Sequence, residues 1–142
     1  MTKMQARKRI ALVAHDNMKP ALAAWALRHR AVLAEHDLWG TGTTGGIVAE
    51  ATGLEITRLK SGPRGGDLQL GAMITEGQLD VLIFFTDPLT AMPHDVDVKA
   101  LLRISVLGGV ALACNATTAD FIVNAADLGA PYAPEPLEQC QT

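Results

Sequence analysis

The stretch Arg9-Ile-Ala-Leu-Val-Ala14, followed at once by His15-Asp16, decides the fold prediction. This run is almost entirely apolar, too short for a helix and ended by polar groups, which predicts a strand buried on both faces. Four further short runs have the same character, and segments with helical spacing separate them. These further strand predictions are Asp37–Gly40, Leu54–Leu59, Asp80–Phe85 and Val110–Ala113.

Helices are expected between and after these strands, at about 18–35, 44–51, 67–78, 95–107 and 117–126. Parallel strands need crossover connections, and such connections lay helices across the faces of the sheet. The alternation therefore predicts an α/β fold, a three-layer α/β/α sandwich with a five-stranded parallel sheet. A chain of 142 residues predicts a single domain, residues 1–142, with an irregular tail at about 131–142.

The composition argues against several classes of function. The net charge of −3 offers no basic footprint for a phosphate backbone, so we expect no nucleic-acid partner. No apolar run reaches the roughly 20 residues that cross a bilayer, so we expect no membrane association. The two cysteines, Cys114 and Cys140, lack the spacing of a zinc site or a disulfide framework, and the chain is expected to be cytoplasmic.

A functional site is expected where the loops that follow the strands gather, because ligands of open α/β sheets bind at the carboxyl ends of the strands. One such loop, Gly40-Thr-Gly-Thr-Thr-Gly45, fits a dinucleotide fingerprint. A nucleotide cofactor is nevertheless disfavoured, since Lys60 ends the next strand where a ribose-binding acid belongs. Two interpretations stay open: a phosphate seat made of backbone N–H groups and threonine hydroxyls, or a strand-to-helix turn with a threonine cap.

The loop Ser61-Gly-Pro-Arg-Gly-Gly66 has a similar ambiguity, since its glycines allow close approach to a ligand but also suit a surface turn. Lys19 could add a positive charge for a phosphate or be an ordinary solvated lysine. Asp67 stands near the start of a predicted helix, so it could be a capping residue or a general base.

The segment from Asp87 to Asp97 holds the densest set of ionisable groups in the chain. His94, Asp95 and Asp97 there, with His15 and Asp16, include residue types that bind metals, but they lack a metal-site spacing. An imidazole that polarises a carbonyl group fits equally well, as does a turn with a capped helix. His29 and His36 are predicted to be structural.

Taken together, these motifs resemble the methylglyoxal synthase family over most of the chain, from Ile10 to about Phe121. The motifs that carry the resemblance are Val13-Ala-His-Asp-x-x-Lys19, Gly40-Thr-Gly-Thr-Thr-Gly45, Ser61-Gly-Pro-Arg-Gly-Gly-Asp-Leu-Gln-Leu-Gly-Ala72, Asp87-Pro-Leu89 and Pro93-His-Asp-Val-Asp-Val-Lys-Ala-Leu-Leu-Arg103. The resemblance implies a flavodoxin-like α/β/α domain that assembles as a homohexamer. It also implies a lyase without metal or cofactor that converts dihydroxyacetone phosphate to methylglyoxal and inorganic phosphate through an enediolate.

The resemblance also implies roles for individual residues. Asp67 corresponds to the catalytic base, His94 to an imidazole that contacts the substrate carbonyl, and Asp97 and Asp87 to supporting carboxylates. His15 corresponds to a substrate-contacting histidine, and Asp16 is adjacent in its motif. The implied phosphate-binding residues are Lys19, Thr41, Gly42, Thr43, Thr44, Ser61 and Gly62.

One alternative function and one departure from the family pattern remain. Similar domains serve as non-catalytic regulatory modules that sense phosphorylated metabolites, but a sensor has no need of Asp67 together with His94. The last arginine is Arg103, so regulatory phosphate contacts made by a late arginine cannot be transferred to this chain.

Overall fold

Five parallel strands form the centre of the protein, in the order β3-β2-β1-β4-β5. The structure is a computed structural model and describes residues 3–89, 98–135 and 137. The strands are β1 (Arg9–Ala14), β2 (Asp37–Thr41), β3 (Thr57–Leu59), β4 (Val81–Phe85) and β5 (Ala111–Ala113). The predicted fold class is confirmed. The likeness to flavodoxin extends to the layers and not to the strand order, which in flavodoxin is 2-1-3-4-5.

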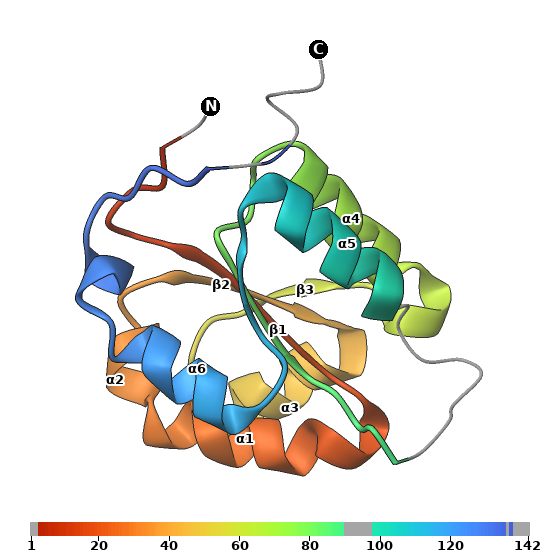
Figure 1. Cartoon of the computed structure of the whole chain (residues 1–142). Coiled ribbons are helices and arrows are strands. Elements are labelled where there is room, and N and C mark those ends of the chain that lie inside the picture. Colours follow the sequence, from red (N-terminus) through yellow and green to blue (C-terminus); the bar gives the residue numbers. More distant parts are fainter. Residues whose placement is uncertain (1–2, 90–97, 136, 138–142) are drawn as a thin grey trace.

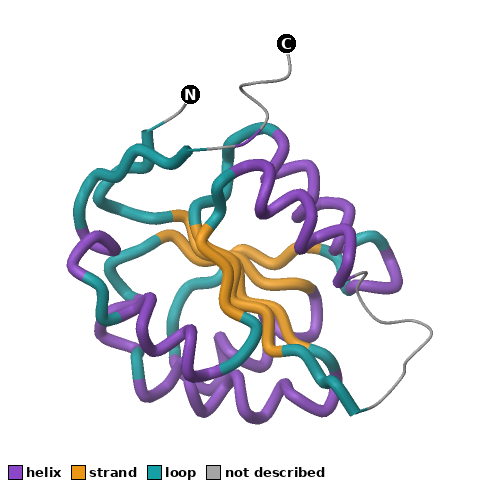
Figure 2. Tube along the Cα trace, viewed as in Figure 1, coloured by secondary structure: helices purple, strands orange, loops and turns teal. Residues whose placement is uncertain are grey.

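The helices cover both faces of this sheet (Figures 1 and 2). They are α1 (Lys19–Arg28), α2 (Arg30–Leu33), α3 (Gly42–Thr52), α4 (Gly66–Thr75), α5 (Val98–Gly108) and α6 (Ala116–Val123), with short 3-10 turns η1 (Asp16–Met18), η2 (Gly62–Arg64) and η3 (Ala126–Gly129). Helices α1, α2, α3 and α6 contribute buried residues to one apolar cluster, and α4 and α5 contribute to the other. The sheet therefore lies between two helical layers.

The alternation of side chains along β1 explains why both layers are needed. Ile10, Leu12 and Ala14 belong to the cluster under α1, whereas Ala11 and Val13 belong to the cluster under α4 and α5. Successive side chains of a strand point to opposite faces, so a strand that is apolar throughout must be covered on both sides.

Several predicted elements differ from the observed ones at their ends, and the structure explains two of the differences. The helix predicted at about 18–35 is interrupted at His29, which leaves the helical conformation (φ −109°, ψ 22°) where its ring bonds Asp120 of α6. The strand predicted at Leu54–Leu59 begins only at Thr57, because β2 pairs with three residues of β3. Leu54 is still buried in the core, so its apolar character reflects packing and not strand pairing.

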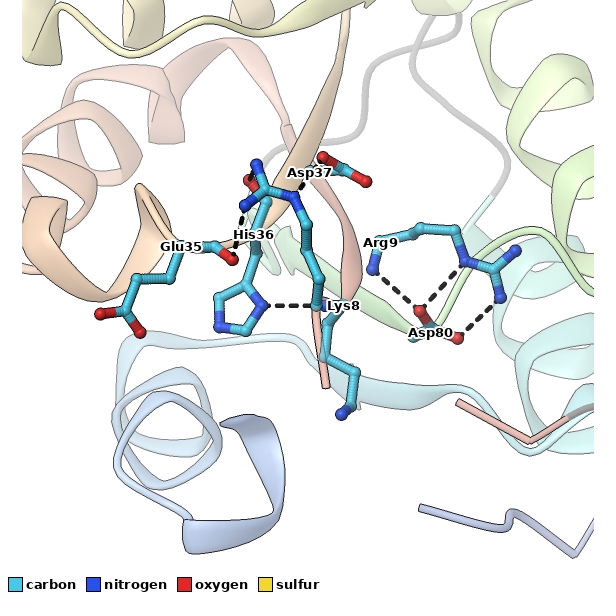
Figure 3. Close-up of polar contacts among 7 residues, drawn as sticks. Lys8, Arg9, Glu35, His36, Asp37 and Asp80 are labelled. Atoms are coloured by element: carbon cyan, nitrogen blue, oxygen red, sulfur yellow. Dashed lines mark hydrogen bonds and ion pairs between the residues drawn. The ribbon is translucent and has the colours of Figure 1, made fainter. Parts of the chain in front are cut away.

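Charged groups at the amino ends of the strands pair with one another (Figure 3). Arg9 donates to both carboxylate oxygens of Asp80, from Nε at 3.1 Å and from Nη2 at 2.9 Å. These hydrogen bonds raise the pKa of the Arg9 guanidinium. Arg7 donates to Asp37 at 2.7 Å, and the Lys8 backbone N–H donates to Nδ1 of His36 at 2.9 Å. This edge of the sheet is therefore held by internal contacts.

Candidate active site

The strand order reverses between β1 and β4, since β1 leads to β2 on one side and β4 leads to β5 on the other. Ligands bind at such a reversal, outside the carboxyl ends of the strands. The two segments that meet there carry His15 and Asp87. The Asp87 backbone N–H donates to Nδ1 of His15 at 2.8 Å. This hydrogen bond joins two candidate site residues, His15 and Asp87, that are 72 positions apart in the chain.

His15 is held in a defined orientation. The residue is 8% exposed, and its ring meets Phe84 edge-on with 5.1 Å between ring centroids. The Asp87 carboxylate accepts from the Leu89 backbone N–H at 3.0 Å and from Nδ2 of Asn17 at 3.1 Å. The bond to Leu89 confirms the turn-forming role that was one interpretation of Asp87.

Thr41 is the last residue of β2, and Ser61 lies two residues after the end of β3. Thr41 is the N-cap residue of α3 and Ser61 that of η2, yet neither side chain accepts a capping hydrogen bond. The interpretation of the first loop as a turn capped by a threonine side chain is therefore wrong for Thr41. The two turns touch, because a Cβ added at Gly42 would lie 2.7 Å from the backbone nitrogen of Ser61.

Close packing accounts for the glycines that fit the dinucleotide fingerprint. A Cβ added at Gly40 would lie 2.7 Å from Cα of Gly45, so the end of β2 and the first turn of α3 need both glycines to approach. Thr44 is buried beside them, as is Thr41, whereas Thr43 is exposed. This segment thus presents hydroxyls on a tight strand-to-helix connection.

Asp67 is the second residue of α4, and the N-cap position belongs to Gly65, whose φ is +101°. The interpretation of Asp67 as a capping residue is therefore wrong, because the left-handed conformation at Gly65 starts the helix earlier. Asp67 is half-buried and lines a cavity of about 330 Å³ between α4 and α5, together with Arg103. His94, Asp95 and Asp97 lie outside the described residues, so their predicted proximity to Asp67 stays a prediction.

Lys19 begins α1 and donates to Asp16 at 2.7 Å. The Lys19 side chain is mostly buried, so the interpretation as a solvated lysine is wrong. Because α1 packs against α3, Lys19 and the Thr41–Thr44 turn start neighbouring helices at the same edge of the sheet (Figure 1).

The remaining candidates have structural contacts. His29 bonds Asp120 at 3.0 Å, and His36 accepts from the Lys8 backbone, as expected for structural histidines. Within residues 3–89, 98–135 and 137, no three His, Cys, Asp or Glu side chains form a group that could hold a metal ion. None of the helices there is long and apolar enough to cross a membrane.

Asn17 is the site residue that the motifs did not single out. It lies in η1 between His15 and Lys19, and its amide donates to Asp87 in the loop after β4. The one signal in the sequence is its place between two selected residues. Its partner, Asp87, lies 70 residues away in the chain, so only the folded structure shows the contact.

This chain is similar to known proteins over most of its length. The family model for an MGS-like domain matches residues 21–114. Methylglyoxal synthase from Leptospira interrogans is 55% identical over 125 residues, covering 88% of this chain and 84% of that protein. The enzyme of the same name from Pseudoalteromonas atlantica is 56% identical over 117 residues, covering 82% and 87%.

A crystal structure of methylglyoxal synthase from Elizabethkingia anophelis has a TM-score of 0.91 and 43% identity. The match covers 99% of this chain and 95% of that one. The resemblance drawn from the motifs is therefore confirmed, and this chain belongs to the methylglyoxal synthase family.

Proposed function

We propose that this chain converts dihydroxyacetone phosphate to methylglyoxal and inorganic phosphate, without a metal or a cofactor. The observation that carries the proposal is the pair of touching turns with Thr41 and Ser61 at their N-caps, neither side chain capping its own helix. Backbone N–H groups at helix starts and free-standing hydroxyls suit a phosphate dianion. Membership of a family whose relatives are named for this synthase supports the same conclusion.

The phosphate would be held by Lys19, Thr41, Gly42, Thr43, Thr44, Ser61 and Gly62. Lys19 already donates to Asp16, but an ammonium group has three donors and can hold a phosphate oxygen as well. Asp16 then keeps Lys19 in place between turnovers. His15, fixed by the Asp87 backbone, would contact the substrate next to this seat.

Asp67 would take a proton from the carbon next to the carbonyl group, leaving the electron pair in an enediolate. A carbon acid is far weaker than a carboxylic acid, so the developing oxyanion must be met by positioned donors, for which His94 is the candidate. Asp97 and Asp87 would support these groups. The electron pair then expels phosphate as the C–O bond breaks, and the resulting enol becomes methylglyoxal.

The residues that bind the phosphate also determine which product forms. Phosphate is lost when its C–O bond is turned out of the enediolate plane, where the bond overlaps the π system. Contacts that kept this C–O bond in the enediolate plane would retain the phosphate and favour isomerisation. Contacts to the remote phosphate thus set the angle of the breaking bond.

The test is turnover of dihydroxyacetone phosphate by purified, chelator-treated protein, with methylglyoxal and free phosphate both measured. Equal amounts of the two products are expected. Binding without turnover would favour the sensor, and activity restored only by a divalent ion would overturn the metal-free mechanism.

Thr41→Val keeps the side-chain shape and should raise KM about three- to tenfold. Thr57→Val, the same change at the start of the neighbouring strand β3, serves as the control.

The same proposal includes a single-domain chain that acts in the cytoplasm and assembles as a homohexamer. Light scattering of the purified protein measures the assembly directly. A monomer that turns over substrate at the full rate would remove the hexamer from the proposal and leave the chemistry in place.

A further inference from the structure

Among the described residues, three hydrogen bonds join the segment after β1 to the end of β4 and the loop that follows it. The His15 backbone N–H donates to the Phe85 carbonyl oxygen at 3.2 Å, and the Asp87 backbone N–H donates to Nδ1 of His15 at 2.8 Å. Nδ2 of Asn17 donates to Oδ2 of Asp87 at 3.1 Å. The bond to Oδ2 of Asp87 comes from Asn17, to which the proposed chemistry assigns no role.

The hydrogen bond from the Asp87 backbone to His15 determines which nitrogen of neutral His15 carries the proton. A neutral imidazole has one donor and one acceptor nitrogen, and a backbone N–H can only donate. Nδ1 therefore accepts, and the proton lies on Nε2. The ring is buried and packed edge-on against Phe84, which opposes a rotation that would exchange its two nitrogens.

The Asp87 side chain holds the backbone that makes this bond. An ionised carboxylate only accepts hydrogen bonds, so Asn17 must present its NH2 group to Oδ2. The other oxygen, Oδ1, accepts from the Leu89 backbone N–H. The carboxylate is thus bonded on one side to η1 and on the other to its own loop, and the N–H of the same residue faces His15.

We propose that Asn17 is a positioning residue: its amide holds the Asp87 loop against the end of β1, so that the Asp87 backbone keeps the proton of His15 on Nε2. The proposal rests on the proposed function in one respect, that His15 contacts the substrate. Nε2–H is then a hydrogen-bond donor for an oxygen of a phosphorylated ketone. Asp87 acts in this arrangement through its main chain.

The test measures the tautomer of His15 by ¹⁵N NMR of the ring nitrogens. The unaltered protein should show Nε2 protonated and Nδ1 as an acceptor. Asn17→Asp has the same shape but faces Asp87 with a second carboxylate, and Asn17→Ala removes the side chain. Both should raise the share of the Nδ1–H tautomer. The matched control is Asn124→Ala, which removes an exposed asparagine amide bond to the Asp120 carbonyl at the end of α6.

Activity provides the second readout. Both Asn17 variants should lower kcat/KM about three- to tenfold, in parallel with the change in tautomer, and Asn124→Ala should not. A proton on Nδ1 in the unaltered protein, or an unchanged tautomer in the Asn17 variants, would overturn the inference. So would an altered tautomer with unchanged kcat/KM. If the unaltered protein fails to turn over the substrate, the proposed function fails, while the tautomer measurement still tests the contact made by Asn17.

Discussion

The two ends of the sheet differ in how some of their polar side chains are bonded. At the amino ends of the strands, Arg9 bonds Asp80 and His36 accepts from Lys8, so polar groups meet other groups of the same chain (Figure 3). At the carboxyl ends, Thr41 and Ser61 occupy N-cap positions without capping. The contacts at the amino ends thus hold the fold together, whereas the carboxyl ends include the two hydroxyls that the proposed function assigns to the phosphate.

The largest expected effect is on activity at the carboxyl end. Asp67→Asn should reduce kcat on the order of 10²- to 10⁴-fold, because it removes the proposed general base. The free energy of unfolding should stay nearly unchanged, since Gly65 and not Asp67 is the N-cap residue of α4. Steady-state kinetics and urea unfolding of the same preparation measure the two effects. A variant with near-normal kcat would remove Asp67 from this role.

At the amino ends of the strands, a substitution should lower stability and leave activity nearly unchanged. Asp80→Asn should lower the free energy of unfolding by about 2–4 kcal/mol, because the Asp80 side chain is buried and the change leaves Arg9 without its charged partner. The kcat of the folded variant should stay close to that of the unaltered protein. Urea unfolding monitored by circular dichroism measures the loss. A variant that folds normally but loses most of its kcat would contradict the separation of the two ends.

A smaller effect, dependent on pH, is expected at His36. Burial and the nearby Lys8 ammonium lower the pKa of His36 from its ordinary value of 6.5. The unfolded chain therefore binds a proton more readily, and this contribution to stability is complete above pH 6.5 and declines as the pH falls toward the folded-state pKa. His36→Asn keeps an acceptor for the Lys8 N–H but does not titrate. Its free energy of unfolding should decline less between about pH 7 and 5.

The smallest expected effect concerns Ser105, inside α5. Its side chain is 1% exposed, and its hydroxyl has no hydrogen-bond partner in the part of the chain that the structure describes. Burying such a group is unfavourable, so Ser105→Ala should raise the free energy of unfolding by about 1 kcal/mol. Thermal unfolding beside Ala125→Ser, an exposed position, gives the comparison. A less stable Ser105→Ala variant would show that the hydroxyl finds a partner in solution.

Local patterns predicted most strands well and the residues that cap the helices less well. The run at Arg9–Ala14 matches β1 residue for residue, because a buried parallel strand needs an unbroken apolar run. The assignment of the cap of α4 to Asp67 was wrong, since a left-handed glycine two residues earlier is the N-cap instead. The break at His29 was missed because it coincides with a contact to Asp120, which is 91 residues away.

The sequence by itself determined the parallel sheet, the edge at which polar loops gather, and the family resemblance, because these depend on periodicity and on motifs that are short and local. Only the tertiary structure decided that Gly42 comes close to Ser61, that Asp87 bonds His15, and that Asn17 bonds Asp87. The physical reason is that these contacts depend on strand order and on the packing of loops. Asn17 and Asp87 are 70 residues apart in the chain, and no local pattern specifies that β4 lies next to β1.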